Sequence, residues 1–185
     1  MFIMEVTTLQ NEFKQLYREI LDSLVKLIPE KWNSVHLYAS INFPNKGEMF
    51  FYYYPKGILK RNAVNCYEIV QKYGINEEQY NQSLSYFYRK IQKLYAISGK
   101  KWSNITINID ENFFILEYHF NNLNDNRYTP EQRHLIWCYK NLKMDEAYLT
   151  NEERNMIENY QEIAIMRPII VKEQIIFYDG QIRIK

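Results

Sequence analysis

Hydrophobic residues recur at helical spacing in two long segments of the chain. In residues 9–28 they lie three or four positions apart, and Pro29 follows at once. Residues 80–94 show the same spacing, and Gly99 comes shortly after them. Each segment is predicted to form a helix that buries one apolar face.

Alternation between apolar and polar residues marks the predicted strands. It is clearest in residues 35–43 and 105–109, where every second side chain is apolar. Turn residues and a further strand-like segment follow each of these, so both are predicted to begin a β-hairpin. The expected hairpins cover residues 35–54, 105–120 and 169–184, and the last of them turns at Asp179 and Gly180.

Capping patterns indicate where helices begin. In each, a short polar side chain is followed three positions later by glutamine or glutamate, so that each side chain bonds the backbone amide of the other residue. The patterns are Thr7 with Gln10, Asn76 with Gln79, Thr129 with Gln132, and Thr150 with Glu153. The last two predict a helix from Pro130 to about Leu142 and a short helix that ends before Pro168. Residues 55–75 are ambiguous and admit a short strand near residues 66–70.

The order helix, hairpin, helix, hairpin, helices predicts an α+β fold, in which an antiparallel sheet carries its helices on one face. A chain of 185 residues suits one such unit. Residues 1–145 are expected to form an α+β domain. Residues 146–185 are expected to add a C-terminal helix and hairpin that pack on the same domain.

The strand predicted over residues 49–54 is aromatic on both faces. Alternation sends Phe51 and Tyr53 to one face, and Phe50, Tyr52 and Tyr54 to the other. One face belongs to the core. The other requires cover by a helix, by the C-terminal hairpin or by a partner protein, because large apolar patches are rarely left exposed without a purpose.

Composition and charge remove several classes of function. A net charge of +1 gives no general attraction to nucleic acid. No segment reaches the roughly 18 apolar residues that a membrane span requires, and the first six residues lack the features of a signal peptide, so a cytoplasmic location is expected. Cys66 and Cys138 lack the spacing of a zinc or redox motif and are expected to be buried free thiols.

Catalytic motifs are absent from the sequence. It contains no glycine-rich phosphate loop, no nucleophile elbow and no HExxH, so neither an enzyme nor a cofactor is expected. Glu117 and His119 are two residues apart on a predicted strand, where they could share a proton or a metal, although a solvated strand face explains them as well. A nucleic-acid-binding module built on Lys100, Lys101 and Trp102 is a further alternative.

Acidic residues gather in two stretches, although the total charge is close to zero. Residues 110–131 contain five acidic residues against Arg127, and residues 140–162 contain six against three basic ones. Solvated faces explain most such stretches. The alternative is an acidic surface that guides a basic protein partner into place.

Parts of the sequence resemble the YezG-type immunity proteins, bacterial antitoxins that pair with secreted nuclease toxins. The most specific matches are the helix exit Ile28-Pro29-Glu30-Lys31-Trp32 and the helix that carries Arg133, Ile136, Trp137 and Tyr139. Further matching segments bring the resemblance to roughly residues 9–142. It implies a protein that binds its cognate toxin inside the producing cell, with no catalytic residues or cofactor of its own.

On this hypothesis the partner is a toxin protein with a nuclease domain, without direct contact to nucleic acid or membrane. The contact is predicted on the first acidic stretch and on aromatic residues expected to be exposed beside it. The predicted partner-binding residues are Tyr52, Tyr54, Asp110, Glu111, Glu117, Tyr118 and Asp125.

Overall fold

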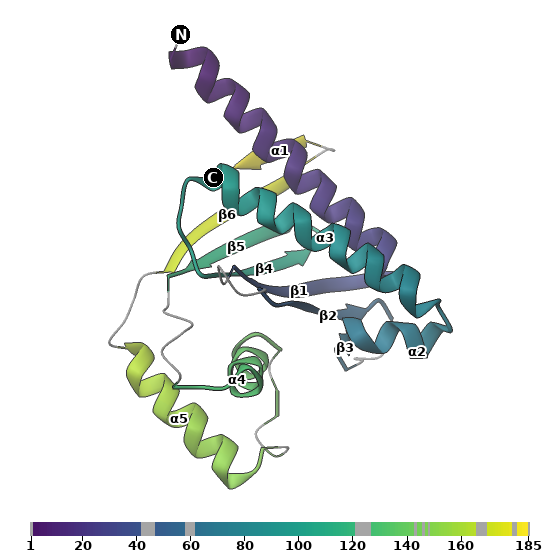
Figure 1. Ribbon diagram of the computed structural model, residues 1–185, viewed down its shortest axis with the longest axis vertical. Helices are drawn as coiled ribbons and strands as arrows, with labels where there is room; N and C mark the ends of the chain where they lie inside the picture. Colours follow the sequence, from purple (N-terminus) through teal and green to yellow (C-terminus); the bar gives the residue numbers. More distant parts are fainter. Residues whose placement is uncertain are drawn as a thin grey trace.

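The computed structural model describes residues 2–41, 47–57, 62–120, 127–142, 144–145, 147, 149–165, 170–178 and 181–184, and the side chains of most of them. Its elements run in the order α1 (Phe2–Leu27), β1 (Trp32–Ser40), β2 (Met49–Pro55), β3 (Val64–Asn65), η1 (Cys66–Glu68), α2 (Ile69–Tyr73), α3 (Glu77–Ser98), β4 (Asn104–Asp110), β5 (Phe113–His119), α4 (Pro130–Leu142), α5 (Asn151–Ile165), β6 (Ile170–Tyr178) and β7 (Gln181–Ile184) (Figure 1).

A seven-stranded sheet forms the centre of the fold, in the order β3-β2-β1-β4-β5-β6-β7. All neighbouring strands are antiparallel, which confirms the predicted α+β class. β6 lies along β5, with Phe113 opposite Ile176 and His119 opposite Ile170. The C-terminal hairpin therefore continues the same sheet.

Helices α1 and α3 cover one face of this sheet and pack side by side (Figure 1). The apolar stripe predicted for each is buried, with Leu16, Ile20 and Leu24 from α1 and Phe87 and Ile91 from α3 in one cluster. α3 begins where its capping pattern predicts, since the Asn76 side chain accepts the backbone N–H of Gln79.

The other face of the sheet carries α4, so the prediction that all helices pack on one face is wrong (Figure 1). The Trp137 indole N–H donates to Thr106 Oγ1 at 2.9 Å, and the Tyr54 hydroxyl donates to the carbonyl of Leu142 at 2.7 Å. The physical reason is the aromatic strand, because the second face of β2 requires cover and α4 supplies it. α5 then packs against α4 through Ile136, Leu149 and Ile157.

Element boundaries differ from the prediction in two places. α1 begins at Phe2, upstream of Thr7, because no glycine or proline interrupts residues 2–6. Residues 66–73 are helical rather than a strand, because the Asn65 side chain accepts the N–H of Tyr67 and Gly74, at φ 62°, ends α2 in the left-handed conformation. The other two capping pairs are confirmed: Thr129 bonds Gln132, and Thr150 bonds Glu153. The predicted turns at residues 44–46 and 179–180 lie outside the described residues.

Removal of the hydroxyl group is expected to have opposite effects on stability at two buried tyrosines. The Tyr53 hydroxyl donates to Glu30 Oε1 at 2.9 Å, whereas the Tyr80 hydroxyl is buried without a hydrogen-bond partner among the described residues. Tyr80→Phe removes an unsatisfied group and is expected to leave the free energy of unfolding unchanged or raise it by up to about 1 kcal/mol. Tyr53→Phe is expected to lower it by about 1.5 kcal/mol, because the lost bond is to a carboxylate. Urea denaturation measures both, and a Tyr80→Phe loss as large as that of Tyr53→Phe contradicts this assignment.

Candidate functional site

The strand register decides which predicted site residues share a surface. On the α4 face, one row across the sheet carries Tyr52, His36 and Asn108, and the next carries Phe50, Tyr38, Thr106, Glu117 and Lys172. Asp110 lies on the same face. It pairs with Ser34 of β1, and Ser34 pairs on its other side with Tyr54 of β2. The structure therefore brings Tyr52, Tyr54, Asp110 and Glu117 to one side of the sheet.

Tyr118 does not belong to this surface, and the prediction that its side chain is exposed is wrong. Its side chain is fully buried on the α1 face, where its hydroxyl donates to Glu173 Oε2 at 3.0 Å. Consecutive strand residues point to opposite faces, so Glu117 and Tyr118 cannot both face a partner. The period-two pattern already carried this signal. Asp125 lies outside the described residues.

Tyr52 and Tyr54 are half-buried and hold α4 against the sheet. The Tyr52 hydroxyl lies 3.0 Å from His134 Nε2, and its ring stacks 6.3 Å from that of Trp137. Tyr54 bonds the last turn of α4 through Leu142. Both aromatic residues therefore have a structural role within the chain.

The acidic residues of the first stretch meet lysines from distant parts of the sequence. The carboxylate of Glu111 forms an ion pair with Lys56, and that of Glu117 forms one with Lys172 at 2.7 Å. Asp110 Oδ1 accepts the backbone N–H groups of Asn112 and Phe113, at 2.7 and 2.8 Å, and closes the β4–β5 turn. The two lysines are part of this surface, and no sequence pattern connects them to it.

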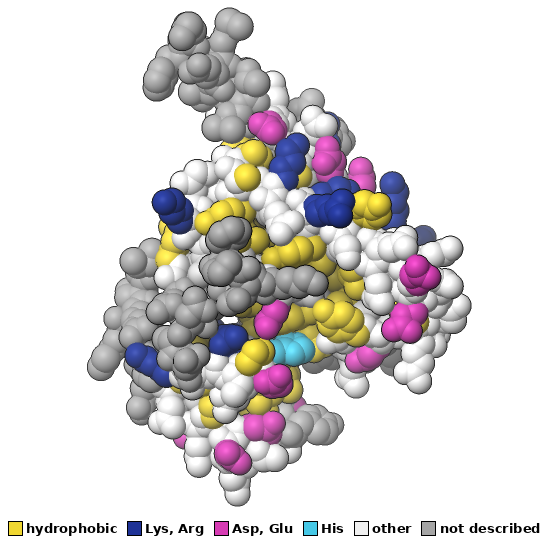
Figure 2. Space-filling model, viewed as in Figure 1, with side chains coloured by type: hydrophobic (Ala, Val, Ile, Leu, Met, Phe, Trp, Pro, Cys, Tyr) yellow, Lys and Arg dark blue, Asp and Glu magenta, His cyan; other side chains and the backbone are white. Residues whose placement is uncertain are grey.

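A second acidic surface lies on the α4–α5 side of the molecule. Figure 2 shows several acidic side chains over these helices, while basic and acidic side chains are mixed over α1 and α3. The exposed acidic residues in this part of the described chain are Glu131, Asp145, Glu152 and Glu158. They include members of the second acidic stretch that the sequence showed.

The catalytic alternative finds little support in the geometry. Glu117 and His119 do lie on one face, but the Glu117 carboxylate is held by Lys172. Burial lowers the pKa of His119 and outweighs the nearby Glu117 carboxylate, which raises it. Among the described residues, no group of three or more potential metal ligands comes together.

The cysteines are buried free thiols, as predicted. Burial raises the pKa of Cys66 to about 12 and that of Cys138 to about 11, so both carry their proton at neutral pH. A thiol in this state is a poor nucleophile and a poor metal ligand.

The nucleic-acid-binding alternative loses its aromatic residue, because Trp102 is part of the interior. Trp102 is 1% exposed, and Lys100 forms an ion pair with Glu173 and lies 4.5 Å from the ring centre of Tyr118. Two of the three residues proposed for nucleic-acid binding are thus engaged within the chain, Lys100 with β6 and Trp102 with α3 and β5. None of the described helices has both the length and the apolar character to cross a membrane.

His134, on α4 beside Tyr52 of the sheet, is expected to make the stability of the protein depend on pH. Burial lowers its pKa from 6.5, and this effect outweighs the Glu48 carboxylate, which raises it. As the pH falls below 6.5 the unfolded chain takes up a proton that the folded chain resists, so the free energy of unfolding falls by at most about 1.4 kcal/mol per pH unit from this group. Urea unfolding at pH 7.5, 6.5 and 5.5 checks this. His134→Gln is expected to have a shallower slope, and an equal slope in both proteins contradicts the assignment.

Comparison with known proteins places this arrangement in a family. The family model described as immunity protein YezG-like matches residues 13–164, from α1 into α5. Two relatives are named immunity protein YezG. The one from Bacillus spizizenii is 26% identical over 150 residues, which cover 78% of this chain and 90% of the relative. The one from Bacillus subtilis is 22% identical over 138 residues, which cover 70% and 87%. The chain therefore belongs to the YezG-like family of immunity proteins.

Proposed function

We propose that this protein binds a cognate nuclease toxin inside the producing cell and neutralises it stoichiometrically, without catalysis. The observation that carries this proposal is the family match over residues 13–164, since membership of an immunity protein family implies a toxin partner. The engaged Glu117 carboxylate and the protonated thiols support a binding role over a catalytic one.

The proposed contact is the acidic end of the sheet at the β4–β5 turn. Asp110 and Glu111 are exposed there, and Glu117 lies on the same face. A nuclease domain presents cationic groups to the phosphates of its substrate, so an acidic surface complements it. The ion pair of Glu111 with Lys56 is exposed on both sides, at 61% and 53%, and exchanges easily for a partner's cation. Residues 146–185 are proposed to support this domain, because β6 pairs with β5.

Co-expression with the toxin encoded beside its gene tests the proposal. Survival of the host and co-purification in a 1:1 complex are the expected results. Death of the host despite a well-folded, abundant protein, or failure of the two proteins to co-purify, contradicts the immunity role for that toxin.

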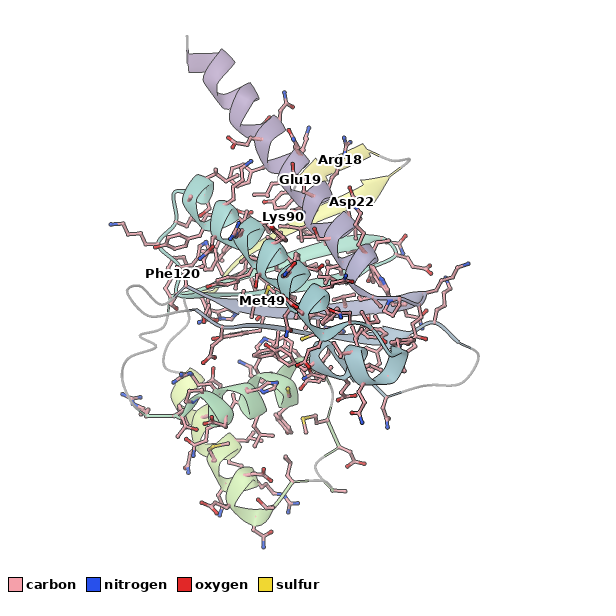
Figure 3. The ribbon with its side chains drawn as sticks, turned by 45° about the vertical axis from the view of Figure 1, so that its right-hand side comes forward. Arg18, Glu19, Asp22, Met49, Lys90 and Phe120 are labelled. Carbon is pink, nitrogen blue, oxygen red and sulfur yellow. The ribbon has the colours of Figure 1, made fainter. Side chains whose placement is uncertain are left out.

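Charge reversal tests the position of the contact. Glu111→Lys is expected to weaken binding about tenfold, mainly through slower association at low salt. Asp22→Lys, on the exposed side of α1 in Figure 3, is the matched control and is expected to have no effect. If Glu158→Lys on α5 weakens binding and Glu111→Lys does not, the contact lies on the second acidic surface and the turn is excluded.

A further inference from the structure

The outward side of α3 is an open, shallow surface formed by residues of this helix and its N-cap. The core side of the helix is used by Leu84, Phe87 and Ile91, which pack against the sheet and α1. The residues of this outward surface face the other way and are exposed. Those that matter here are Glu78, Asn81, Gln82, Ser85, Tyr86 and Arg89.

The spacing of these residues is that of a helix–helix seam. Glu78, Gln82, Ser85 and Arg89 follow one another at intervals of four, three and four positions, and so form a single stripe along α3. Asn81 and Tyr86 flank the stripe on either side. In an antiparallel helix pair, positions of this kind oppose each other in layers.

This stripe is complementary to itself. When a second α3 is placed antiparallel about a two-fold axis between residues 83 and 84, Glu78 opposes the partner's Arg89. The same axis sets Gln82 against the partner's Ser85, and it brings Tyr86 to the same edge of the seam as the partner's Tyr86. A two-fold interface requires this reciprocity: if one residue contacts a second residue of the partner, the second residue must contact the partner's copy of the first. The acid at one end and the cation at the other supply the charge complementarity.

Tyr86 and Arg89 have the properties of an interface anchor. Tyr86 is 62% exposed, and the Arg89 guanidinium lies 5.2 Å from the centre of its ring. That contact orders two large side chains before any partner arrives, which reduces the entropy lost on binding. Tyrosine and arginine are also the residue types that contribute most to hot spots in protein interfaces.

We propose that α3 pairs with the α3 of a second copy in an antiparallel, two-fold dimer. The seam is polar, so the dimer is weak and forms at micromolar concentrations or above. The inference is independent of the proposed toxin neutralisation, because the dimer is measured on the isolated protein. α3 also lies on the face of the sheet away from α4 (Figure 1).

Sedimentation of the purified full chain over about 1–500 µM tests the proposal, with the expected result a concentration-dependent dimer. Arg89→Glu and Glu78→Arg each set like charges against each other and are expected to weaken it at least about tenfold, equivalent to about 1.4 kcal/mol. The double variant Glu78→Arg, Arg89→Glu restores the opposite pairing. It is expected to recover the affinity to within about threefold.

A tyrosine pair provides the matched control. Tyr67 on η1 is as exposed as Tyr86, at 62%, but lies outside the outward surface of α3. Tyr86→Ala is expected to weaken the dimer and Tyr67→Ala to leave it unchanged, with circular dichroism to verify folding. A protein that stays monomeric over the whole range overturns the proposal. So does a double variant that fails to recover while folded, or equal effects of the two alanine variants.

Discussion

Replacement of Trp137 by alanine is expected to lower the free energy of unfolding by about 3–5 kcal/mol. The indole is 7% exposed and lies between α4 and the sheet, with the ring of Phe50 at 5.1 Å and that of Tyr38 at 6.1 Å. Truncation leaves a cavity among these rings and deprives Thr106 Oγ1 of its donor. Urea unfolding followed by circular dichroism measures the loss.

Trp137→Phe separates the two contributions to this loss. It keeps an aromatic ring in the interface but removes the N–H that bonds Thr106, so a smaller loss of about 1–2 kcal/mol is expected. The same variants also test whether toxin binding depends on the position of α4, because displacement of this helix exposes Tyr52 and Tyr54. An alanine variant within 1 kcal/mol of the parent would show that α4 does not depend on this packing.

Replacement of Glu30 by alanine is the second large effect, expected to cost about 2–3 kcal/mol of folding stability. Its Oε1 accepts hydrogen bonds from Tyr53 at 2.9 Å, from Lys72 at 2.9 Å and from Tyr73. The carboxylate thereby joins the exit of α1 to β2 and α2. Tyr53 is fully buried, so loss of its charged acceptor is poorly compensated by the remaining contact with Tyr73.

Glu30 is also expected to make the free energy of unfolding depend on pH, with a sign that follows from its pKa. Burial raises the pKa of Glu30, but the hydrogen bonds from Tyr73, Lys72 and Tyr53 outweigh it, so the pKa lies below 4.5. The stability that the carboxylate contributes is therefore complete above pH 4.5 and is lost as the pH falls through the folded pKa. Glu30→Gln is expected to lose this component while it keeps one acceptor oxygen.

Glu68→Ala is the matched control for this second effect. Glu68 is exposed and lies close by on η1, and its removal is expected to change stability by less than about 0.5 kcal/mol. Equal unfolding free energies for the Glu30 and Glu68 variants at pH 7 would contradict the proposed network. Unfolding titrations at pH 7, 5 and 4 distinguish the two residues.

Much of the local structure was predictable because it depends on residues close together in the chain. The capping pairs Asn76–Gln79, Thr129–Gln132 and Thr150–Glu153 bond across three positions, and the helices begin there. The hairpin of β4 and β5 follows from alternation and from Asp110, whose side chain closes its turn. The interior position of Trp102 was not predictable from its basic neighbours, since the rings of Tyr95 on α3 and Tyr118 on β5 create that environment.

The candidate site was predictable only in part. Alternation along residues 113–119 would have excluded Tyr118, because it sets Tyr118 on the face opposite to Glu117. That Asp110 and Glu117 share a face follows only from the β4–β5 register. The charge of that face was not predictable, because Lys56 reaches Glu111 from 55 positions away and Lys172 reaches Glu117 through the β5–β6 register.

By itself the sequence determined the four longer helices, the hairpins and the buried stripes, because each depends on hydrogen bonds or periodicities that span a few residues. It also carried the resemblance to an immunity family. Only the tertiary structure decided that α4 covers the second face of the sheet, that Tyr52 and Tyr54 hold it there, and which carboxylates meet lysines. The ion pairs depend on strand register, which joins segments far apart in the chain. The position of α4 depends on the burial of aromatic surface on β2, and the sequence alone left more than one segment able to provide that cover.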